Sequence, residues 1–248
     1  ENEVRWLQRV AGIDPRLVPA VVASVPEEHM FALAYLAPEA HPVWRDELIA
    51  GRVDRDFAAG LGRALARIHA AAADRAADAA AFDSMDLFDA LRISPFLRYV
   101  AANRPELAPR LDAIADDLQR RRVALVHGDV SPKNILAGPA GGVILDAECA
   151  VYGDPAFDLA FCTTHLVLKT IWLAGHAAAL KDSASAFVAA YLAEVTWEPV
   201  GDLATRAGSL VAALLLARVE GKSPAPYLDG NAKETVRAKA LALLAAAP

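Results

Sequence analysis

Lysine and cysteine are scarce in this sequence. No lysine occurs among the first 132 residues, and the whole chain has two cysteines, Cys149 and Cys162. Two cysteines in 248 residues do not make a disulfide framework, so we expect free thiols and a reducing, cytoplasmic setting. A basic excess is also missing, because 31 Asp and Glu outnumber 25 Lys and Arg. This balance argues against nucleic acid as the partner.

Long apolar runs and secretion signals are missing as well. No uncharged stretch reaches the roughly 18 consecutive apolar residues that a membrane span needs. Residues 1–5 lack the basic flank and apolar stretch of a secretory signal. With 55% hydrophobic and 23% charged residues, the chain can still bury a large core. We therefore expect a folded protein of one large or two small domains, with no membrane partner.

Several phosphate- and metal-binding motifs do not occur. Gly60-Leu-Gly62 is the only G-x-G before the middle of the chain, and it lies in a helical pattern with Leu65 where the next glycine belongs. Gly221-Lys-Ser223 fails as a P-loop because Leu216 occupies the position of the first glycine. The absence of H-E-x-x-H, paired C-x-x-C and G-x-S-x-G argues against a zinc enzyme and a serine hydrolase.

Hydrophobic periodicity predicts the order of the elements. Residues 1–11 and 53–73 carry apolar side chains at helical spacing, and 19–26 and 30–36 are short runs typical of strands. Further helices are predicted at 84–92 and 105–120. Three brief strands are predicted at 123–126, 135–136 and 143–145, and helices from Phe157 to the end.

Two further segments are assigned from composition and spacing. The Ala- and Asp-rich segment 70–83 is interpreted as a connector between helices. One apolar stripe in the last third of the chain is interpreted as core, and it comprises Leu203, Leu210, Val211, Leu214 and Leu215. The chain thus begins with a small α/β part and continues as a mostly helical part with short strands in its middle.

A set of polar residues lies among those short strands. His127, Asp129 and Asn134 have the spacing of the protein-kinase catalytic loop H-R-D-L-x-x-x-N. Asp146 follows 17 residues after Asp129, at the end of the apolar run Val143-Ile-Leu145. A loop between strands can direct one carboxylate toward a hydroxyl, while an amide oxygen and a second carboxylate meet at a hard cation. The pattern therefore predicts transfer of a phosphoryl group.

Four segments carry a more specific resemblance. The segments are Leu65-Ala-Arg-Ile-His69, His127-Gly-Asp129 with Asn134, Ile144-Leu-Asp146-Ala-Glu148, and Gly153-Asp154-Pro-Ala-Phe157-Asp158-Leu-Ala160. Together they resemble the aminoglycoside phosphotransferase and choline kinase superfamily of small-molecule kinases. His-Gly-Asp in place of His-Arg-Asp, and Asp-x-Glu in place of Asp-Phe-Gly, favour the small-molecule branch. The resemblance implies an α+β, protein-kinase-like fold of two lobes, with a mostly helical C-lobe whose short strands carry the catalytic and metal loops.

The resemblance also implies roles for individual residues. Asp129 is the expected catalytic base or hydroxyl-orienting group, and Asn134 and Asp146 are the expected Mg²⁺ ligands. Glu148 assists a second metal or its water in this interpretation. Lys133 either offers positive charge to the transferring phosphate or is a solvated loop lysine.

Two residues are expected to support the loop. His127 is predicted to brace it and not to act as an acid or base. Asp158 is predicted to be a buried carboxylate that accepts backbone N–H groups from the catalytic loop, with an ordinary helix N-terminal carboxylate as the alternative.

The nucleotide lobe is expected to be incomplete, since neither its Gly-rich loop nor its lysine is found. Residues 1–36 are predicted to be the remainder of this lobe and 37–248 the catalytic and substrate-binding C-lobe, with roughly 30 to 50 residues of strands preceding the chain. Glu3 is the predicted partner of the missing lysine, with Glu1 as the alternative. The backbone near Tyr35 and Leu36 is predicted to meet adenine at the hinge.

The sequence thus predicts an ATP- and Mg²⁺-dependent kinase that phosphorylates a hydroxyl of an aminoglycoside-, choline-, sugar- or homoserine-like acceptor. A catalytically silent kinase-like binding protein and a Mg²⁺-dependent phosphatase or nucleotidase are the alternatives. Four acidic residues near the C-terminus either suit a cationic acceptor or form a solvated helical face: Glu194, Glu198, Asp202 and Glu220.

Overall fold

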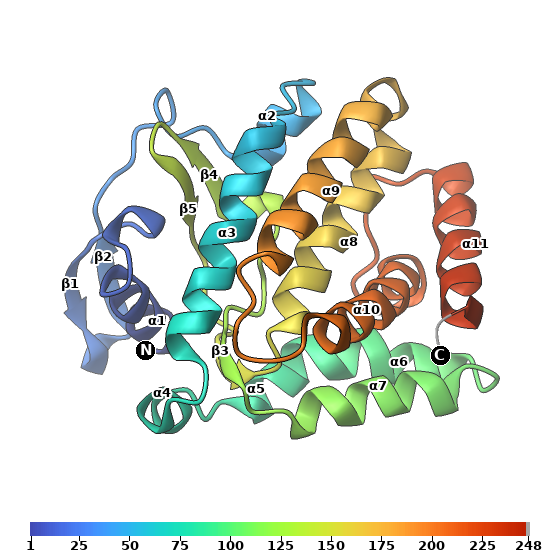
Figure 1. Ribbon diagram of the computed structural model, residues 1–248, viewed down its shortest axis with the longest axis horizontal. Helices are drawn as coiled ribbons and strands as arrows, with labels where there is room; N and C mark the ends of the chain where they lie inside the picture. The colour runs from blue at the N-terminus through green and yellow to red at the C-terminus, as the bar shows by residue number, and fades with distance from the viewer. Residues whose placement is uncertain (247–248) are drawn as a thin grey trace.

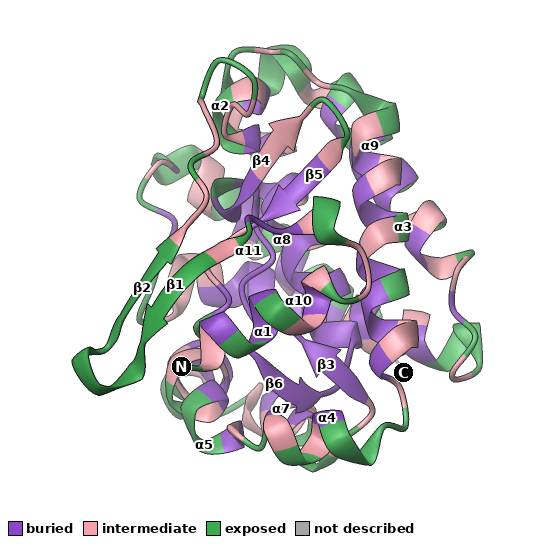
Figure 2. Cartoon of the chain, turned by 90° about the vertical axis from the view of Figure 1, so that its left-hand side faces the viewer, coloured by how far each residue is buried: buried purple, intermediate pink, exposed green. Residues whose placement is uncertain are grey.

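The computed structural model describes residues 1–246. Its N-terminal part consists of α1 (Asn2–Ala11) and an antiparallel pair of strands, β1 (Val21–Val25) and β2 (Met30–Leu33), seen on the left of Figure 1. Short 3₁₀ turns η1 (Pro15–Leu17) and η2 (Pro26–Glu28) flank β1. The β1–β2 pair projects as an exposed ribbon in Figure 2. The predicted helix and strand pair are thus confirmed.

The rest of the described chain is mainly helical. Its helices are α2 (Trp44–Ile49), α3 (Arg55–Ala72), α4 (Ala76–Ala81), α5 (Met85–Phe88), the π-helical segment η3 (Asp89–Arg98), α6 (Tyr99–Asn103), α7 (Ala108–Arg120), α8 (Ala156–Trp172), the 3₁₀ turn η5 (Ala174–His176), α9 (Ala177–Leu192), α10 (Val200–Glu220) and α11 (Gly230–Ala246). α3 packs along α9 in the centre of Figure 1, and α10 packs on α8 and α11.

Two further strand pairs lie in the middle of the chain. β3 (Ala124–Val126) pairs with β6 (Val151–Gly153), and β4 (Ile135–Gly138) pairs with β5 (Gly141–Ile144), both antiparallel. The 3₁₀ turn η4 (Pro132–Asn134) precedes β4. The loops β3–β4 and β5–β6 therefore start and end on paired strands, which hold the predicted catalytic and metal loops side by side.

The structure corrects two interpretations of the sequence. The predicted connector 70–83 contains α4, because an Ala-rich segment favours helix and because Arg9 holds Asp78 of α4 by two hydrogen bonds of 2.8 and 2.9 Å. The short strand β6 was not predicted, since its three residues are fixed by pairing with distant β3 and not by a local pattern.

The predicted apolar stripe of α10 faces the core. Leu203, Leu210, Leu214 and Leu215 are buried, and Val211 is partly buried against them. By length and composition α10 is also long and apolar enough to cross a membrane, as is the bent α8–α9 pair if it is counted as one span. Their packing against each other and against neighbouring helices is that of core helices.

Close packing explains one glycine of the Gly60-Leu-Gly62 pair. A Cβ on Gly62 would lie 2.3 Å from the carbonyl oxygen of Phe187, so only glycine lets α3 approach α9 this closely. Gly60, two residues earlier in the same helix, has no atom nearer than 4.0 Å from such a Cβ. The motif therefore serves helix packing and not phosphate binding.

We predict opposite effects of two alanine substitutions in α3. Gly62→Ala should lower the free energy of unfolding by about 1–3 kcal/mol, because the methyl group overpacks the α3–α9 contact. Gly60→Ala, the matched control, should raise it by about 0.5–1 kcal/mol through helix propensity. Urea unfolding of both variants measures these changes, and a stabilising Gly62→Ala would contradict the packing argument.

Candidate active site

A buried carboxylate holds the loop that follows β3. Asp158, in the first turn of α8, is fully buried, and its two oxygens accept the backbone N–H groups of His127 at 2.7 Å and Gly128 at 2.9 Å. His69 of α3 also lies 3.2 Å from Asp158 and donates through Nε2, while its Nδ1 is 2.6 Å from the hydroxyl of Tyr191. One carboxylate thus joins α8 and α3 to the start of the loop.

Burial and hydrogen bonding act in opposite directions on Asp158. Burial raises its pKa, but the hydrogen bond and charge of His69, together with His127, outweigh this and hold the pKa below its ordinary value. The group is therefore an anion that the loop N–H groups and His69 stabilise.

His127 joins the two loops to each other. The N–H of Asp129 donates to its Nδ1 at 3.0 Å, so the ring proton is on Nε2, which donates to the carbonyl oxygen of Leu145 at 3.0 Å. Burial lowers the pKa of His127, although the nearby carboxylates of Asp158 and Asp129 oppose this, so the neutral ring is favoured. Trp6 of α1 packs edge-on against the ring at 4.8 Å. This arrangement matches a bracing group and leaves no ring nitrogen free for acid–base chemistry.

Gly128 has a positive φ of 82°. A Cβ at this position would also lie 2.8 Å from the carbonyl oxygen of Cys149. Glycine is therefore required at the centre of His127-Gly-Asp129, for both conformation and space.

Asp129 is held by protein contacts at one carboxylate oxygen and lines a cavity. Its Oδ2 receives the side-chain amide of Asn134 at 2.9 Å and lies 3.2 Å from Arg92 and 3.0 Å from Lys133. Among the hydrogen bonds of residues 1–246, none reaches Oδ1. Asp129 lines a cavity of about 410 Å³. A hydroxyl in this cavity can therefore donate to Oδ1 of a carboxylate whose orientation is fixed.

A π-helical turn supplies Arg92. Arg92 and Pro95 both lie in the π-helical segment η3, and the guanidinium of Arg92 donates to the carbonyl oxygen of Leu91 at 2.9 Å. Arg92 also donates to the carbonyl oxygen of Gly128 at 2.5 Å, next to its contact with Asp129. The irregular helix and the catalytic loop thus hold each other.

The predicted metal ligands present oxygen atoms. The amide nitrogen of Asn134 donates to Asp129, and no hydrogen bond from the described residues reaches its Oδ1. Asp146 has a left-handed backbone, with φ of 66°, and its partly exposed carboxylate lies 3.9 Å from Lys133. The backbone N–H of Leu145 donates to the carbonyl oxygen of Asn134 at 2.9 Å, which brings the two ligands' segments together.

This donor set suits Mg²⁺, which is typically bound by one or two protein oxygens together with phosphates and water. Within residues 1–246, no three His, Cys, Asp or Glu side chains are grouped to hold a metal without such a ligand. Glu148 is exposed and lines the cavity near Asp129.

The residues predicted to meet the nucleotide have different surroundings. Glu3 is partly buried near Asp146, and burial, then the charges of Asp146 and Glu148, raise its pKa, although a hydrogen bond from the Asp146 backbone lowers it. No lysine or arginine of residues 1–246 forms an ion pair with Glu3. Tyr35 is 83% exposed, and Leu36 is partly buried beyond the end of β2.

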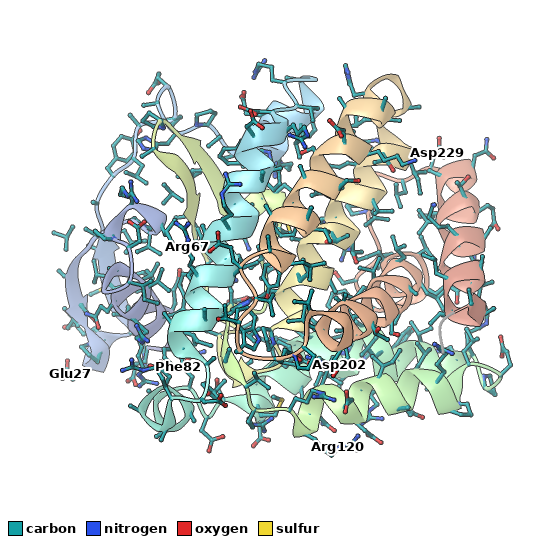
Figure 3. All side chains as sticks on the ribbon, viewed as in Figure 1. Glu27, Arg67, Phe82, Arg120, Asp202 and Asp229 are labelled. Atoms are coloured by element: carbon teal, nitrogen blue, oxygen red, sulfur yellow. The ribbon has the colours of Figure 1, made fainter. Side chains whose placement is uncertain are left out.

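The acidic residues near the C-terminus lie outside the cavity. Glu194 pairs with Arg67 at 3.3 Å, and Glu198 with Arg206 at 2.8 Å, while Glu220 pairs with Arg104 at 2.9 Å and with Arg237. The exposed Asp202 lies at the start of α10 in Figure 3. Three of the four thus take part in ion pairs of the helical framework, and none lines the wall beside Asp129.

The comparisons with known proteins agree with this geometry. The model of the phosphotransferase enzyme family, APH, matches residues 1–195. The chain belongs to this family. The resemblance drawn from the four sequence segments is thereby confirmed. No curated protein matches the sequence.

Solved structures show the same fold across 97–98% of this chain. A choline/ethanolamine kinase family protein from Mesorhizobium loti has a TM-score of 0.57 at 16% identity, with 79% of its own chain covered. An aminoglycoside phosphotransferase from Alicyclobacillus acidocaldarius has 0.53 at 19% identity, with 80% covered. A glucosamine kinase in complex with glucosamine, ADP and inorganic phosphate has 0.51 at 19% identity, with 70% covered. The predicted kinase-like fold is confirmed.

Some residues of this site were missed in the sequence. Arg92, Lys169 and Arg218 line the cavity with Asp129 but lie far from it in the chain. The one local signal is Lys169, a single lysine that directly follows the apolar run Leu166-Val-Leu168 of α8. Arg92 and Arg218 reach the site through packing, which no local pattern indicates.

We predict that Asp158→Asn destabilises the protein by about 1–3 kcal/mol or more, because the amide cannot accept both N–H groups and the His69 donor. The folded pKa of Asp158 lies below the unfolded value near 3.8, so its stabilisation is complete above that pH and is lost as pH falls through the folded pKa. In urea unfolding, the difference in free energy of unfolding between wild type and variant should therefore be constant near neutral pH and should become smaller below about pH 4. An equal gap at all pH values would contradict this account.

Proposed function

We propose that this protein transfers the γ-phosphate of ATP, with Mg²⁺, to a hydroxyl group of a small molecule. One observation carries the proposal: Asp129 is fixed through Oδ2 by Asn134, Arg92 and Lys133, while Oδ1 is left for a hydroxyl in the adjoining cavity. Membership of the phosphotransferase enzyme family supports the same reaction type.

The residues divide the work of transfer. Asp129 orients the acceptor hydroxyl through Oδ1 and accepts its proton as the new oxygen–phosphorus bond forms and ADP leaves. Asn134 Oδ1 and the Asp146 carboxylate would hold Mg²⁺, which when bound neutralises charge on the phosphate oxygens. Lys133, between Asp129 and Asp146, adds a positive charge near the transferred group.

The backbone at Asp146 favours a functional role for this loop. A non-glycine residue in the left-handed region costs about 1–3 kcal/mol, and the Asp146 backbone holds this conformation with a hydrogen bond to Glu3. Such strain is typical of ligand-binding positions. The glucosamine kinase relative, captured with ADP and inorganic phosphate, supports nucleotide as the donor.

A catalytically silent binding protein is the second candidate. It is favoured by Glu3, which has no lysine partner among the described residues, whereas a kinase holds the α- and β-phosphates with such a lysine. The two candidates differ in turnover, and not in whether a nucleotide binds.

We predict that Asp129→Ala and Asp146→Ala each reduce kcat for acceptor-dependent release of ADP by at least about 100-fold. The assay uses Mg²⁺-ATP with a panel of hydroxyl acceptors, including an aminoglycoside, choline, hexoses and hydroxy acids. Asp112→Ala, which removes a partly exposed partner of Arg98 away from the site, is the matched control and should keep wild-type turnover.

Near-normal turnover in either site variant would contradict the proposal. ADP release at the same rate without any acceptor would instead indicate a phosphatase. Far-ultraviolet circular dichroism of each variant checks that the fold is retained.

A further inference from the structure

The cavity beside Asp129 is basic. Its wall is formed by α2, η3, the catalytic loop, the loop between β5 and β6, α8, α10 and the segment after α10. Two carboxylates, Asp129 and Glu148, face it together with five cationic side chains, which are Arg45, Arg92, Lys133, Lys169 and Arg218. Of the predicted metal ligands, Asn134 and Asp146 do not line the wall, whereas Glu148 does.

Three of these cations already have carboxylate partners. Arg92 and Lys133 contact Asp129, and Arg45 contacts Asp46 at 2.8 Å. The positive charge that remains unpaired in the wall belongs to Lys169 and Arg218.

Lys169 is a buried cation without an acidic partner. It is 3% exposed, and no carboxylate among residues 1–246 forms an ion pair with it. Its ammonium group lies 5.8 Å from the centre of the Tyr227 ring. Burial lowers the pKa of Lys169 to about 8; the charge of Cys162 opposes this, while Arg45 and Arg218 add to it. An unpaired buried charge is costly and is typically retained for binding.

Arg218 is in a similar position. It donates to the carbonyl oxygen of Ser223 at 2.5 Å and lies over the ring of Phe96 at 5.9 Å, but its Nε has no hydrogen-bond partner among residues 1–246. Within the same described part of the chain, the hydroxyl groups of Tyr227 and the fully buried Ser131, which line the same wall, are also without partners. Buried polar atoms in folded proteins are nearly always paired, so three such atoms in one wall indicate a polar ligand.

We propose that the acceptor carries an anionic group, a carboxylate or a phosphate, in addition to the hydroxyl that is phosphorylated. Lys169 and Arg218 bind the anionic group, and Ser131 and Tyr227 offer it hydroxyl donors, while Asp129 faces the hydroxyl. This rests on the proposed function. It disfavours cationic acceptors of the aminoglycoside or choline type, since the wall has no unpaired carboxylate apart from Glu148 to receive them.

The test measures thermal shifts with small probes at constant ionic strength. The full-length protein is saturated with Mg²⁺ and a non-hydrolysable ATP analogue, and then receives inorganic phosphate, malonate, glucose or tetramethylammonium. The same probes are added without nucleotide. We expect phosphate or malonate to raise the Tm both with and without nucleotide. A larger shift with phosphate indicates that the acceptor carries a phosphate group, and a larger shift with malonate indicates a carboxylate. Tetramethylammonium and glucose should have no such effect.

Variants locate the effect. In Lys169→Met the anion should bind at least tenfold more weakly, whereas Lys181→Met, at an exposed lysine of α9, should bind it as wild type does. Equal anion binding in wild type and Lys169→Met, or stabilisation by tetramethylammonium but not by the anions, would overturn the proposal. Failure of the nucleotide analogue to bind would instead count against the proposed function. The titration without nucleotide would still show whether the anion binds at Lys169.

Stability separates a ligand-binding lysine from a structural one. Without ligand, Lys169→Met should have a Tm equal to or above that of wild type, because it removes an unpaired buried charge. Arg206→Met is the contrasting variant, because the partly buried Arg206 pairs with Asp154 and Glu198, each at 2.8 Å, and its loss should lower the Tm. A lower Tm for Lys169→Met would show that Lys169 holds the fold together and would overturn its role in ligand binding.

Discussion

The contact between Asp158 and the two backbone N–H groups of His127 and Gly128 determines the shape of the site. A carboxylate removed from water is favourable only when it is fully hydrogen-bonded, and these N–H groups and His69 meet that requirement. Because Asp158 lies on α8 and His69 on α3, the loop is fixed to two of the helices at the centre of the molecule (Figure 1). The position of Asp129, one residue further on, follows from this anchoring.

A second set of contacts transmits the anchoring to the loop before β6. His127 donates to the carbonyl oxygen of Leu145, and the N–H of Leu145 donates to the carbonyl oxygen of Asn134, so Asp146 is placed relative to Asn134 by the main chain. Asn2 of α1 donates to the carbonyl oxygens of Glu148 and Ala150 at 3.2 and 2.6 Å. The N-terminal helix therefore takes part in shaping this loop, although it supplies no ligand to the predicted Mg²⁺ site.

The sequence predicts the parts of the site that depend on local order. His127, Asp129, Asn134 and Asp146 lie at fixed spacings within short loops between apolar runs, so motif and strand pattern together indicate their neighbourhood. The α+β kinase-like fold and the family follow from the same segments.

Other parts could not be predicted because distant segments create them. Arg92 reaches Asp129 from the π-helical segment η3, where its guanidinium also donates to the carbonyl oxygen of Leu91, and no local pattern indicates this meeting of distant segments. The basic wall combines residues from α2, η3, α8 and α10, and its charge becomes visible only when their side chains meet. The acidic residues near the C-terminus resemble a binding surface in the sequence, but arginines such as Arg67 and Arg104 neutralise most of them in the fold.

The most direct test of the account is calorimetric titration of the full-length protein with ATP in the presence and absence of Mg²⁺, for wild type and for Asp146→Asn. The account predicts saturable binding that depends on Mg²⁺ in wild type and loses this dependence when Asp146 can no longer hold the ion. Binding of equal strength with and without Mg²⁺ in both proteins, or no binding by folded wild type, would contradict it.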